Sequence, residues 1–471
     1  MVSETARLAE KQFFESEKKK HPELFIRQPL VDDIPHLQWI GIESLSEGLP
    51  IGYIKLYPQD FIVEEISGDG ALRSVETGEL FKDLTKEGQT HYADLVKISL
   101  STFDACDAIA QALGIERKSV SYSGIKDRQA LTSQKISLRN VPDIRKAELL
   151  ANDYFFLKNI ESGKGAVSQG DLQGNRFTIA VRLIAPLTEI QLAKINEALA
   201  DIKQNGFWNF YSFQRFGTPR LLSHRLGRLL LRGEYENVLK TFFTTVTDRE
   251  LPYFQNLRRK MLAAWGAWES LKEIIAPFPV HFEMENIFVD YLLKNPADFL
   301  GALRQMPEQI KLWFYAYDSY LFNRKLSELI AAGEVPEFLP MANSFNQFDR
   351  KPYEKFLQED GVILPNPYYR DFPFIRVESR RNRTTQPAEI IDIAASDHFV
   401  FFSFSLPKGA YATSFLMNFF ILASGLPVPA GISFDQIDPK SSLGLGSLQP
   451  VLEKFQKVLS ERAVLLEGSE E

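Results

Sequence analysis

The sequence predicts an α+β protein in which a sheet is layered with helices. Segments with the apolar alternation of strands recur between residues 51 and 183, and they return between residues 390 and 404. Two helical segments interrupt them, and each begins at a capping box and ends at a glycine. Because the order includes hairpin-like returns, we expect strands of one sheet with helices packed against it.

The first half of the chain contains the clearest elements. One helix is expected from Ser101 to Gly114 and a second from Thr188 to Gly206, each with its apolar residues on one stripe. The expected strands lie at residues 51–55, 61–65, 92–100, 120–122, 134–139, 154–160 and 177–183.

The composition and the residue pattern of the sequence change after Gly206. Residues 209–217 are dense in aromatic rings, residues 225–325 are largely helical in pattern, and strand patterns return at 390–393 and 399–404. We therefore expect a mostly helical domain inserted into a discontinuous core. The expected parts are an N-terminal extension (1–50), the first part of the core (51–205), the inserted domain (206–375), the second part of the core (376–460) and a disordered tail (461–471).

Composition excludes several kinds of site. The chain has 471 residues, a net charge of −7 and 45% hydrophobic residues, which is typical of a globular protein. Cys106 is the one cysteine, so neither a disulfide within the chain nor a thiolate metal cluster can form. The six histidines show no pair at ligand spacing, so we expect no metal. Charges near the N-terminus and the lack of a long apolar run predict a cytoplasmic protein without membrane contact.

A loop between two expected strands carries the most informative residues. Gly124 breaks the first strand, and the loop extends to about Thr132. Asp127 lies on it between two cations, Lys126 and Arg128, which favour the ionised carboxylate. An ionised aspartate held by strands suits a nucleophile or an electrostatic partner better than a proton donor. Taken alone, the segment also fits a solvated turn.

Five blocks of residues occur in order and span most of the chain: Pro58…Asp60-Phe61…Glu64, Gly124-Ile125-Lys126-Asp127-Arg128 with Ala130, Thr132 and Gln134, Gly174-Asn175-Arg176-Phe177, Asn209…Gln214-Arg215-Phe216-Gly217, and Leu406-Pro407-Lys408-Gly409 with Tyr411-Ala412-Thr413. Together they resemble the TruD family of pseudouridine synthases. Two departures stand out. Where the family usually has Asn-Tyr-Phe-Gly, this chain has Asn209-Phe210-Tyr211-Ser212, which swaps the rings and loses the glycine, and Gln59 stands where an acidic residue is common.

The resemblance implies a fold and a reaction. The fold would be a discontinuous catalytic core, with a mixed and largely antiparallel sheet, carrying an inserted, mostly helical α+β domain. The reaction would isomerise a uridine in RNA to pseudouridine, typically uridine 13 of transfer RNA, without any cofactor. We expect a monomer. Asp127 would supply the anion near C1′ or C6, and attack at C1′, attack at C6 and a glycal route all remain open.

The resemblance also implies a set of substrate-binding residues. Phe61, Phe177 and Tyr411 would stack on a flipped uracil, although each ring taken alone fits a core position better. Asn175 would form hydrogen bonds with the edge of uracil or hold the loop that carries Asp127. Lys55 and Lys126 would orient Asp127 or contact phosphate. The residues are Lys55, Phe61, Glu64, Lys126, Asn175, Phe177, Arg215 and Tyr411.

Two other functions fit parts of the pattern. A glycosidase could pair Asp127 with Glu64, but it needs a carboxylic acid of raised pKa and a sugar site. A non-catalytic RNA-binding or RNA-remodelling protein would keep the rings and the arginines without needing Asp127. For RNA recognition we expect a basic cleft between the inserted domain and the core, lined by Arg215, Arg220, Arg225, Arg228, Arg232, Arg380, Arg381 and Arg383.

Overall fold

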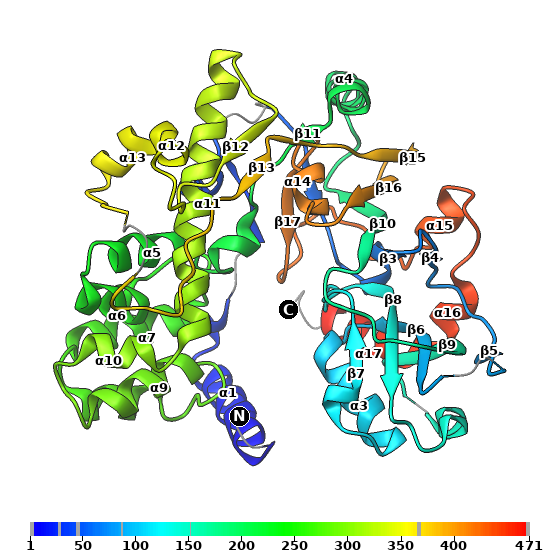
Figure 1. Cartoon of the computed structure of the whole chain (residues 1–471), viewed down its shortest axis with the longest axis horizontal. Coiled ribbons are helices and arrows are strands. Elements are labelled where there is room, and N and C mark those ends of the chain that lie inside the picture. The colour runs from blue at the N-terminus through cyan, green and yellow to red at the C-terminus, as the bar shows by residue number, and fades with distance from the viewer. Residues whose placement is uncertain are drawn as a thin grey trace. The chain divides into compact units, whose positions relative to one another are not determined.

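The computed structural model describes residues 4–26, 30–43, 48–85, 88–150, 152–364 and 369–467. The chain forms two compact units, each built from two separate stretches (Figure 1). The sheet unit comprises Ser46–Trp208 and Thr385–Glu471, and the helical unit comprises Met1–Leu45 and Asn209–Thr384. The chain therefore leaves the sheet unit after Trp208 and returns to it at Thr385.

The sheet unit contains a mixed sheet. Its strand order is β17-β2-β10-β3-β8-β6-β9-β5, with β16 also paired to β10, β15 to β16, β4 to β3 and β7 to β8. Three pairings are parallel, β3–β8, β2–β17 and β5–β9, and the others in this sheet are antiparallel. The strands are β2 (Ile51–Tyr53), β3 (Phe61–Ser67), β4 (Leu72–Arg73), β5 (Phe81–Asp83), β6 (Thr90–Ile98), β7 (Val120–Tyr122), β8 (Leu131–Arg139), β9 (Phe155–Gly163), β10 (Leu172–Leu183), β15 (Glu389–Ala395), β16 (Phe399–Pro407) and β17 (Ile421–Ser424).

Both predicted helices of this unit are confirmed. In α3 (Thr102–Leu113), the Ser101 side chain accepts from the Asp104 N–H, and Gly114 ends the helix at φ 68°, a conformation that favours glycine. In α4 (Glu189–Asn205), Thr188 forms the expected capping box. The remaining elements are α14 (Ala412–Leu416), α15 (Pro439–Ser442), α16 (Gln449–Lys454), α17 (Gln456–Glu467), the short ladder of β11 (Phe207–Trp208) with β14 (Thr385–Gln386), and the 3₁₀ turns Pro58–Asp60, Arg117–Ser119 and Ile144–Leu149.

Helices cover both faces of the sheet. Leu95 and Ile136 pack with Cys106 and Ile109 of α3, so α3 covers one face. On the opposite face, Ile62 packs in a cluster with residues of α16 and α17. This layering confirms the α+β class, and it gives β6 and β8 one face toward α3 and one toward the C-terminal helices.

The helical unit is organised around the 26-residue helix α11 (Pro307–Ala332). Buried residues occur all around α11, and its apolar residues Ile310, Trp313 and Phe314 join the core of the unit. The other helices are α1 (Glu4–Lys20), α2 (Ile34–Trp39), α5 (Ser223–Leu231), α6 (Tyr235–Thr244), α7 (Pro252–Ala263), α8 (Trp268–Ile275), α9 (Glu283–Leu292), α10 (Phe299–Arg304), α12 (Gln347–Arg350) and α13 (Glu354–Glu359); shorter pieces are β1 (Leu30–Val31), β12 (Phe338–Pro340), β13 (Arg381–Arg383) and the 3₁₀ turns Pro22–Phe25, Phe213–Phe216 and Lys351–Tyr353.

The expectation of a separate N-terminal extension is wrong for the described residues. Arg249 donates to the Val31 carbonyl at 3.0 Å and to Asp32 at 2.9 Å. The buried Asn323 amide donates to the Ile40 carbonyl at 2.9 Å. These bonds satisfy polar groups of the N-terminal segment inside the helical unit, so the segment is part of that unit's packing.

The prediction of a disordered tail is wrong for residues 461–467. Residues 461–467 continue α17, and Leu466 is buried, because the apolar side of this helix packs in the sheet unit. Residues 468–471 of the predicted tail lie outside the described residues. Among the helices that the structure describes, none is both long and apolar enough to cross a bilayer.

Candidate active site

Strand register brings the predicted site residues to one face of the sheet. Residues that are directly opposite on neighbouring strands point to the same side. Val63 is opposite Phe177 of β10 and Thr132 of β8, and Thr132 is opposite Lys97 of β6. One step along, Glu65 is opposite Asn175. This surface, which α3 partly covers, is called the site face below.

The loop between β7 and β8 holds Asp127 at this face. Lys97 is fully buried, and its ammonium group donates to the carbonyl oxygens of Asp127 and Leu100, both at 2.8 Å. Burial lowers the pKa of Lys97 to about 8, although the Asp127 charge acts in the opposite direction. The lysine therefore fixes the backbone of Asp127, while the aspartate side chain remains 36% exposed.

Lys55 is the cation that neighbours the Asp127 carboxylate. Its Nζ lies 3.3 Å from Asp127 Oδ1 and 4.1 Å from the centre of the Phe61 ring. Its backbone has φ 62°, which is uncommon for a residue with a side chain. The strained conformation costs of order 1–3 kcal/mol and persists only where the surroundings enforce it. Lys55 is thus held between the carboxylate and a ring of the site face.

The cations next to Asp127 in sequence have different positions from those expected. Lys126 points away from the carboxylate and forms a buried ion pair with Glu65 at 2.8 Å. It also donates to Asn175 Oδ1 at 2.8 Å. Arg128 is exposed. The prediction that both neighbours flank the carboxylate is therefore wrong for Lys126, which instead joins the loop to β3 and β10.

Further hydrogen bonds anchor the same loop. The Ser123 hydroxyl donates to Glu65 at 2.6 Å, and the Lys126 N–H donates to the Thr102 hydroxyl at 3.1 Å. Gln134 donates to the Gly124 carbonyl at 2.9 Å. Three loop positions, Ser123, Gly124 and Lys126, are consequently tied to β3, β8 and α3, so the loop is fixed although it has no regular structure.

Glu65 is a site residue that the sequence analysis missed, and Glu64 was selected in its place. Glu64 lies on the opposite face, where it pairs with Lys440 at 2.7 Å and accepts from the Val75 N–H at 2.8 Å. The expectation that Glu64 binds substrate is therefore wrong. The alternation of side chains along a strand could have identified Glu65, because Glu65 points to the same face of β3 as Phe61, whereas Glu64 points to the opposite face.

The predicted rings lie at or beside the site face. Phe177 lies between Phe61, with centroids 6.1 Å apart, and Phe404 of β16, at 5.4 Å. Phe404 in turn stacks on Phe415 of α14 at 4.0 Å. Phe177 is only 6% exposed and Phe61 only 1%, whereas Tyr411, at the start of α14, is 38% exposed. Tyr411 is the predicted ring with the most accessible surface.

Arg215 belongs to the helical unit. It donates to the Ser319 hydroxyl at 3.0 Å and lies 5.4 Å from the centre of the Tyr211 ring. Asp127 belongs to the sheet unit, and the role of Arg215 in substrate binding stays a prediction.

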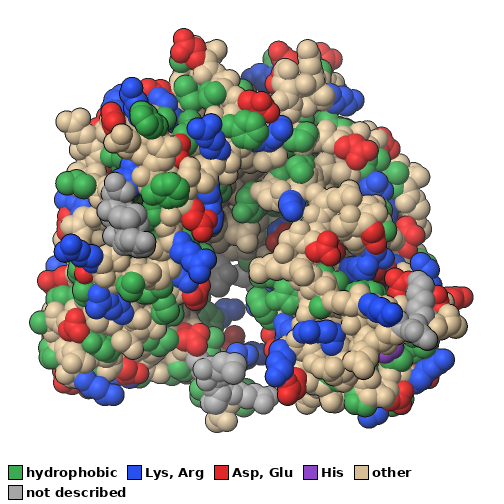
Figure 2. Space-filling view, in the orientation of Figure 1, with side chains coloured by type: hydrophobic (Ala, Val, Ile, Leu, Met, Phe, Trp, Pro, Cys, Tyr) green, Lys and Arg blue, Asp and Glu red, His purple; other side chains and the backbone are tan. Residues whose placement is uncertain are grey.

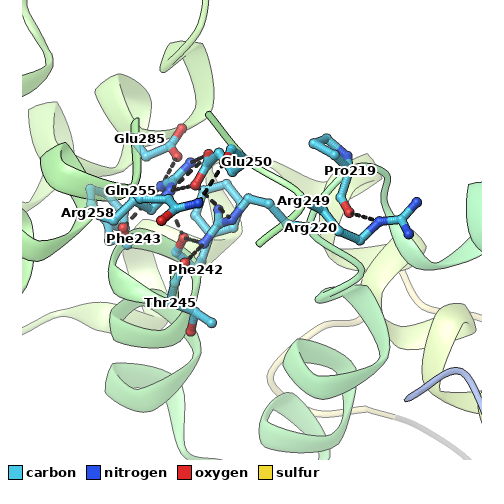
Figure 3. A network of polar contacts seen from close by, with 10 residues as sticks. All are labelled: Pro219, Arg220, Phe242, Phe243, Thr245, Arg249, Glu250, Gln255, Arg258 and Glu285. Atoms are coloured by element: carbon cyan, nitrogen blue, oxygen red, sulfur yellow. Dashed lines mark hydrogen bonds and ion pairs between the residues drawn. The ribbon is translucent and has the colours of Figure 1, made fainter. Parts of the chain in front are cut away.

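Several of the other arginines serve the protein's own packing. Arg220 is buried and donates to the carbonyl oxygens of Phe242 and Thr245, beside the pair formed by Arg258 and Glu250 (Figure 3). Arg228 pairs with Asp360 and Arg232 with Glu234. The expectation of an RNA contact is thus wrong for Arg220. On the visible face of each unit, lysine and arginine side chains lie among aspartate and glutamate (Figure 2).

The described residues contain no cluster of three or more His, Cys, Asp or Glu side chains arranged to hold a metal ion.

Comparison with known proteins identifies the family. The sequence model of the family described as tRNA pseudouridine synthase D (TruD) matches residues 45–340. A probable tRNA pseudouridine synthase D of Methanopyrus kandleri is 32% identical over 345 residues, which is 68% of this chain and 83% of that protein. The tRNA pseudouridine synthase D of Aquifex aeolicus is 26% identical over 402 residues, covering 78% of this chain and 97% of that protein.

A solved structure has the same fold. The crystal structure of the putative tRNA pseudouridine synthase D from Methanosarcina mazei superposes with a TM-score of 0.65 at 23% identity, covering 82% of this chain and 98% of that chain. It supports the α+β architecture of sheet and helices described above. With the family match over more than half of the residues, the conclusion is direct: this chain belongs to the TruD family of tRNA pseudouridine synthases.

Proposed function

We propose that this enzyme converts a uridine of transfer RNA, expected to be uridine 13, to pseudouridine, with Asp127 as the catalytic carboxylate. The observation that carries the proposal is the environment of Asp127. Its backbone is clamped by Lys97, its carboxylate is partly exposed, and it lies beside Lys55 and the aromatic site face. Glu65, the other carboxylate on this face described above, is buried and already paired.

The reaction needs only rearrangement of bonds. The bond from uracil N1 to ribose C1′ breaks, a bond from C5 to C1′ forms, C5 loses a proton and N1 gains one. No atom is oxidised or reduced. A positioned anion near C1′ or C6 assists the departure of uracil, and Asp127 supplies it by attack at C1′, by attack at C6 or along a glycal route.

The surrounding residues support binding of an extruded base. Removing a uridine from its stack costs a few kcal/mol, and stacking on a ring returns about 1–3 kcal/mol per base. Tyr411 is the most exposed of the predicted rings, and Phe177 lies on the site face with 6% of its surface exposed. Asn175 accepts from Lys126 through Oδ1, and its amide N–H can donate to a uracil carbonyl. Lys55 would orient Asp127 or contact phosphate.

The geometry disfavours the two other functions. A glycosidase that uses Asp127 with Glu64 would need both carboxylates at one cleft, but Glu64 lies on the opposite face of β3 and is paired with Lys440. A protein that only binds RNA has no need for a partly exposed aspartate whose backbone is held by a buried lysine. Activity of variants separates this last alternative from the proposal.

The test replaces Asp127 with Asn. RNA labelled with tritium at uracil C5 releases tritium as pseudouridine forms, so turnover is measured directly. We expect Asp127→Asn to bind RNA and melt like the wild type but to release no tritium. Arg128→Gln is the matched control, because this neighbour is exposed on the same loop and should keep its activity. Turnover by Asp127→Asn near the wild-type rate would contradict the assignment, and sequencing of modified transfer RNA would locate the uridine.

A further inference from the structure

The helical unit contains a cavity of about 520 Å³ that the reaction at Asp127 does not use. This volume lies within the range of small-molecule sites. Its lining comes from helices α2, α5 and α11 and from the segment after α6. The lining residues are Gln38, Trp39, Arg220, Leu221, Leu222, His224, Arg225, Arg228, Val246, Thr247, Tyr317 and Tyr320.

The charged side chains that line this cavity are all cationic. Its lining includes three arginines and no carboxylate. Arg225 is exposed, and no ion pair is recorded for it within the described ranges. Arg228 pairs with Asp360, which also accepts from the Tyr317 hydroxyl, so the nearest acid is shared. Arg225 has no carboxylate partner among the described residues, so its guanidinium group suits an anion, and the planar fork of a guanidinium matches phosphate oxygens.

Four side chains of the lining have a buried polar atom without a hydrogen-bond partner among the described residues: Arg220 Nε, Arg228 Nε, His224 Nδ1 and Thr247 Oγ1. His224 Nδ1 and Thr247 Oγ1 show no hydrogen-bond partner among the described residues, and the two residues are only 6% and 7% exposed. Burial, reinforced by Arg225 and Arg228, lowers the pKa of His224 to about 3, so the ring is neutral. Buried polar groups normally have partners. These two atoms lack such partners, and both residues border the cavity.

Aromatic rings complete the lining. Trp39 is 48% exposed, although it is one of the largest apolar side chains of the unit. Tyr320 stacks on His224, with centroids 4.8 Å apart and planes 25° apart. An exposed indole and a stacked phenol beside arginines are the combination that binds the flat face of a base.

We propose that this cavity binds a single unstacked nucleotide of the RNA substrate, with the base against Trp39 and its phosphate on Arg225 and Arg228. The proposal rests on the proposed function for the identity of the RNA. It gives the helical unit its own binding site, independent of the site face in the sheet unit. Inorganic phosphate would use the arginines alone, and a nucleoside would use the ring alone, so a nucleotide should bind more tightly than either.

The experiment uses the full chain labelled with 5-fluorotryptophan. The protein has five tryptophans, and the ¹⁹F signal of Trp39 is the one lost in Trp39→Phe. Adenosine monophosphate, adenosine and inorganic phosphate are titrated separately. We expect the monophosphate to shift the Trp39 signal at lower concentration than the other two. Arg225→Gln should weaken this binding about 10–100-fold, as expected for loss of a charge-assisted bond.

The controls separate this site from the catalytic one. Arg232→Gln removes the same charge but from an arginine that is paired with Glu234 outside the lining, so it should bind the nucleotide as the wild type does. Asp127→Asn should also retain the shift. A Trp39 signal that is unmoved by nucleotide, or moved equally by phosphate, would overturn the proposal.

A second arm asks whether the occupant belongs to the RNA. Trp39→Ala should raise the Kd for transfer RNA. An unchanged Kd in Trp39→Ala would overturn the assignment to RNA even if the free nucleotide binds. Nucleotide binding in a protein that forms no pseudouridine would instead contradict the proposed function and leave the cavity assignment standing.

Discussion

Glu64 and Glu65 are adjacent on β3 and point to opposite faces of the sheet. Substituting each in turn therefore tests which face holds the active site. Glu65 pairs with Lys126 at 2.8 Å on the site face, and Glu64 pairs with Lys440 at 2.7 Å on the opposite face. Both glutamates are at most 1% exposed. Replacing each in turn with Gln removes the same charge from the same strand. The two variants therefore differ in the face that is disturbed.

The expected loss of stability is similar for both variants. Removing one partner of a buried ion pair leaves the other charge without compensation and costs about 3–5 kcal/mol. Glutamine still offers one acceptor oxygen, so we expect about 3 kcal/mol for each. Since domains have about 5–15 kcal/mol of stability, both variants should remain folded at 25 °C.

The expected loss of activity is different. Glu65→Gln frees Lys126 and with it Asn175 and the segment from Ser123 to Asp127, and misplacement of a reacting group by about 1 Å costs about 100-fold. We expect kcat to fall by about 100-fold in Glu65→Gln and to stay near the wild-type value in Glu64→Gln. Urea unfolding measures stability, and tritium release at saturating RNA measures kcat. Equal losses of kcat in the two variants would refute the assignment of the site to this face.

Three further predictions use other contacts. Tyr411→Ala should lower kcat/KM by about 5–150-fold, the equivalent of 1–3 kcal/mol of stacking, without changing Tm, and a lower Tm would instead indicate a packing role. Lys97→Met removes the donor to the carbonyls of Asp127 and Leu100, so kcat should fall while RNA affinity is retained; an unaltered kcat would show that the loop holds without it. His224 stays neutral when folded because its pKa is about 3, but it takes up a proton below pH 6.5 when unfolded. The wild type should therefore lose about 2 kcal/mol more stability than His224→Phe between pH 6.5 and 4.5, measured by urea unfolding, and parallel pH curves would contradict this.

The sequence by itself determined the local elements and the chemistry of the loop. Capping residues and terminal glycines act within a few positions, so the helices after Ser101 and Thr188 could be predicted from neighbouring residues. The same holds for the strands on either side of Asp127, because alternation is local. The family resemblance added the expected reaction, and the comparisons confirmed the family.

Tertiary structure decided which side chains face the site. Alternation shows that Glu64 and Glu65 point to opposite faces, but only pairing with β10 and packing of α3 show which face holds Asp127. The partner of Glu64 is 376 residues away in sequence, and Lys55 reaches Asp127 from a different strand end. Arg220 looked like a surface cation, yet it is buried among main-chain carbonyls. Ion pairs and burial depend on contacts between distant segments, and no local pattern encodes them.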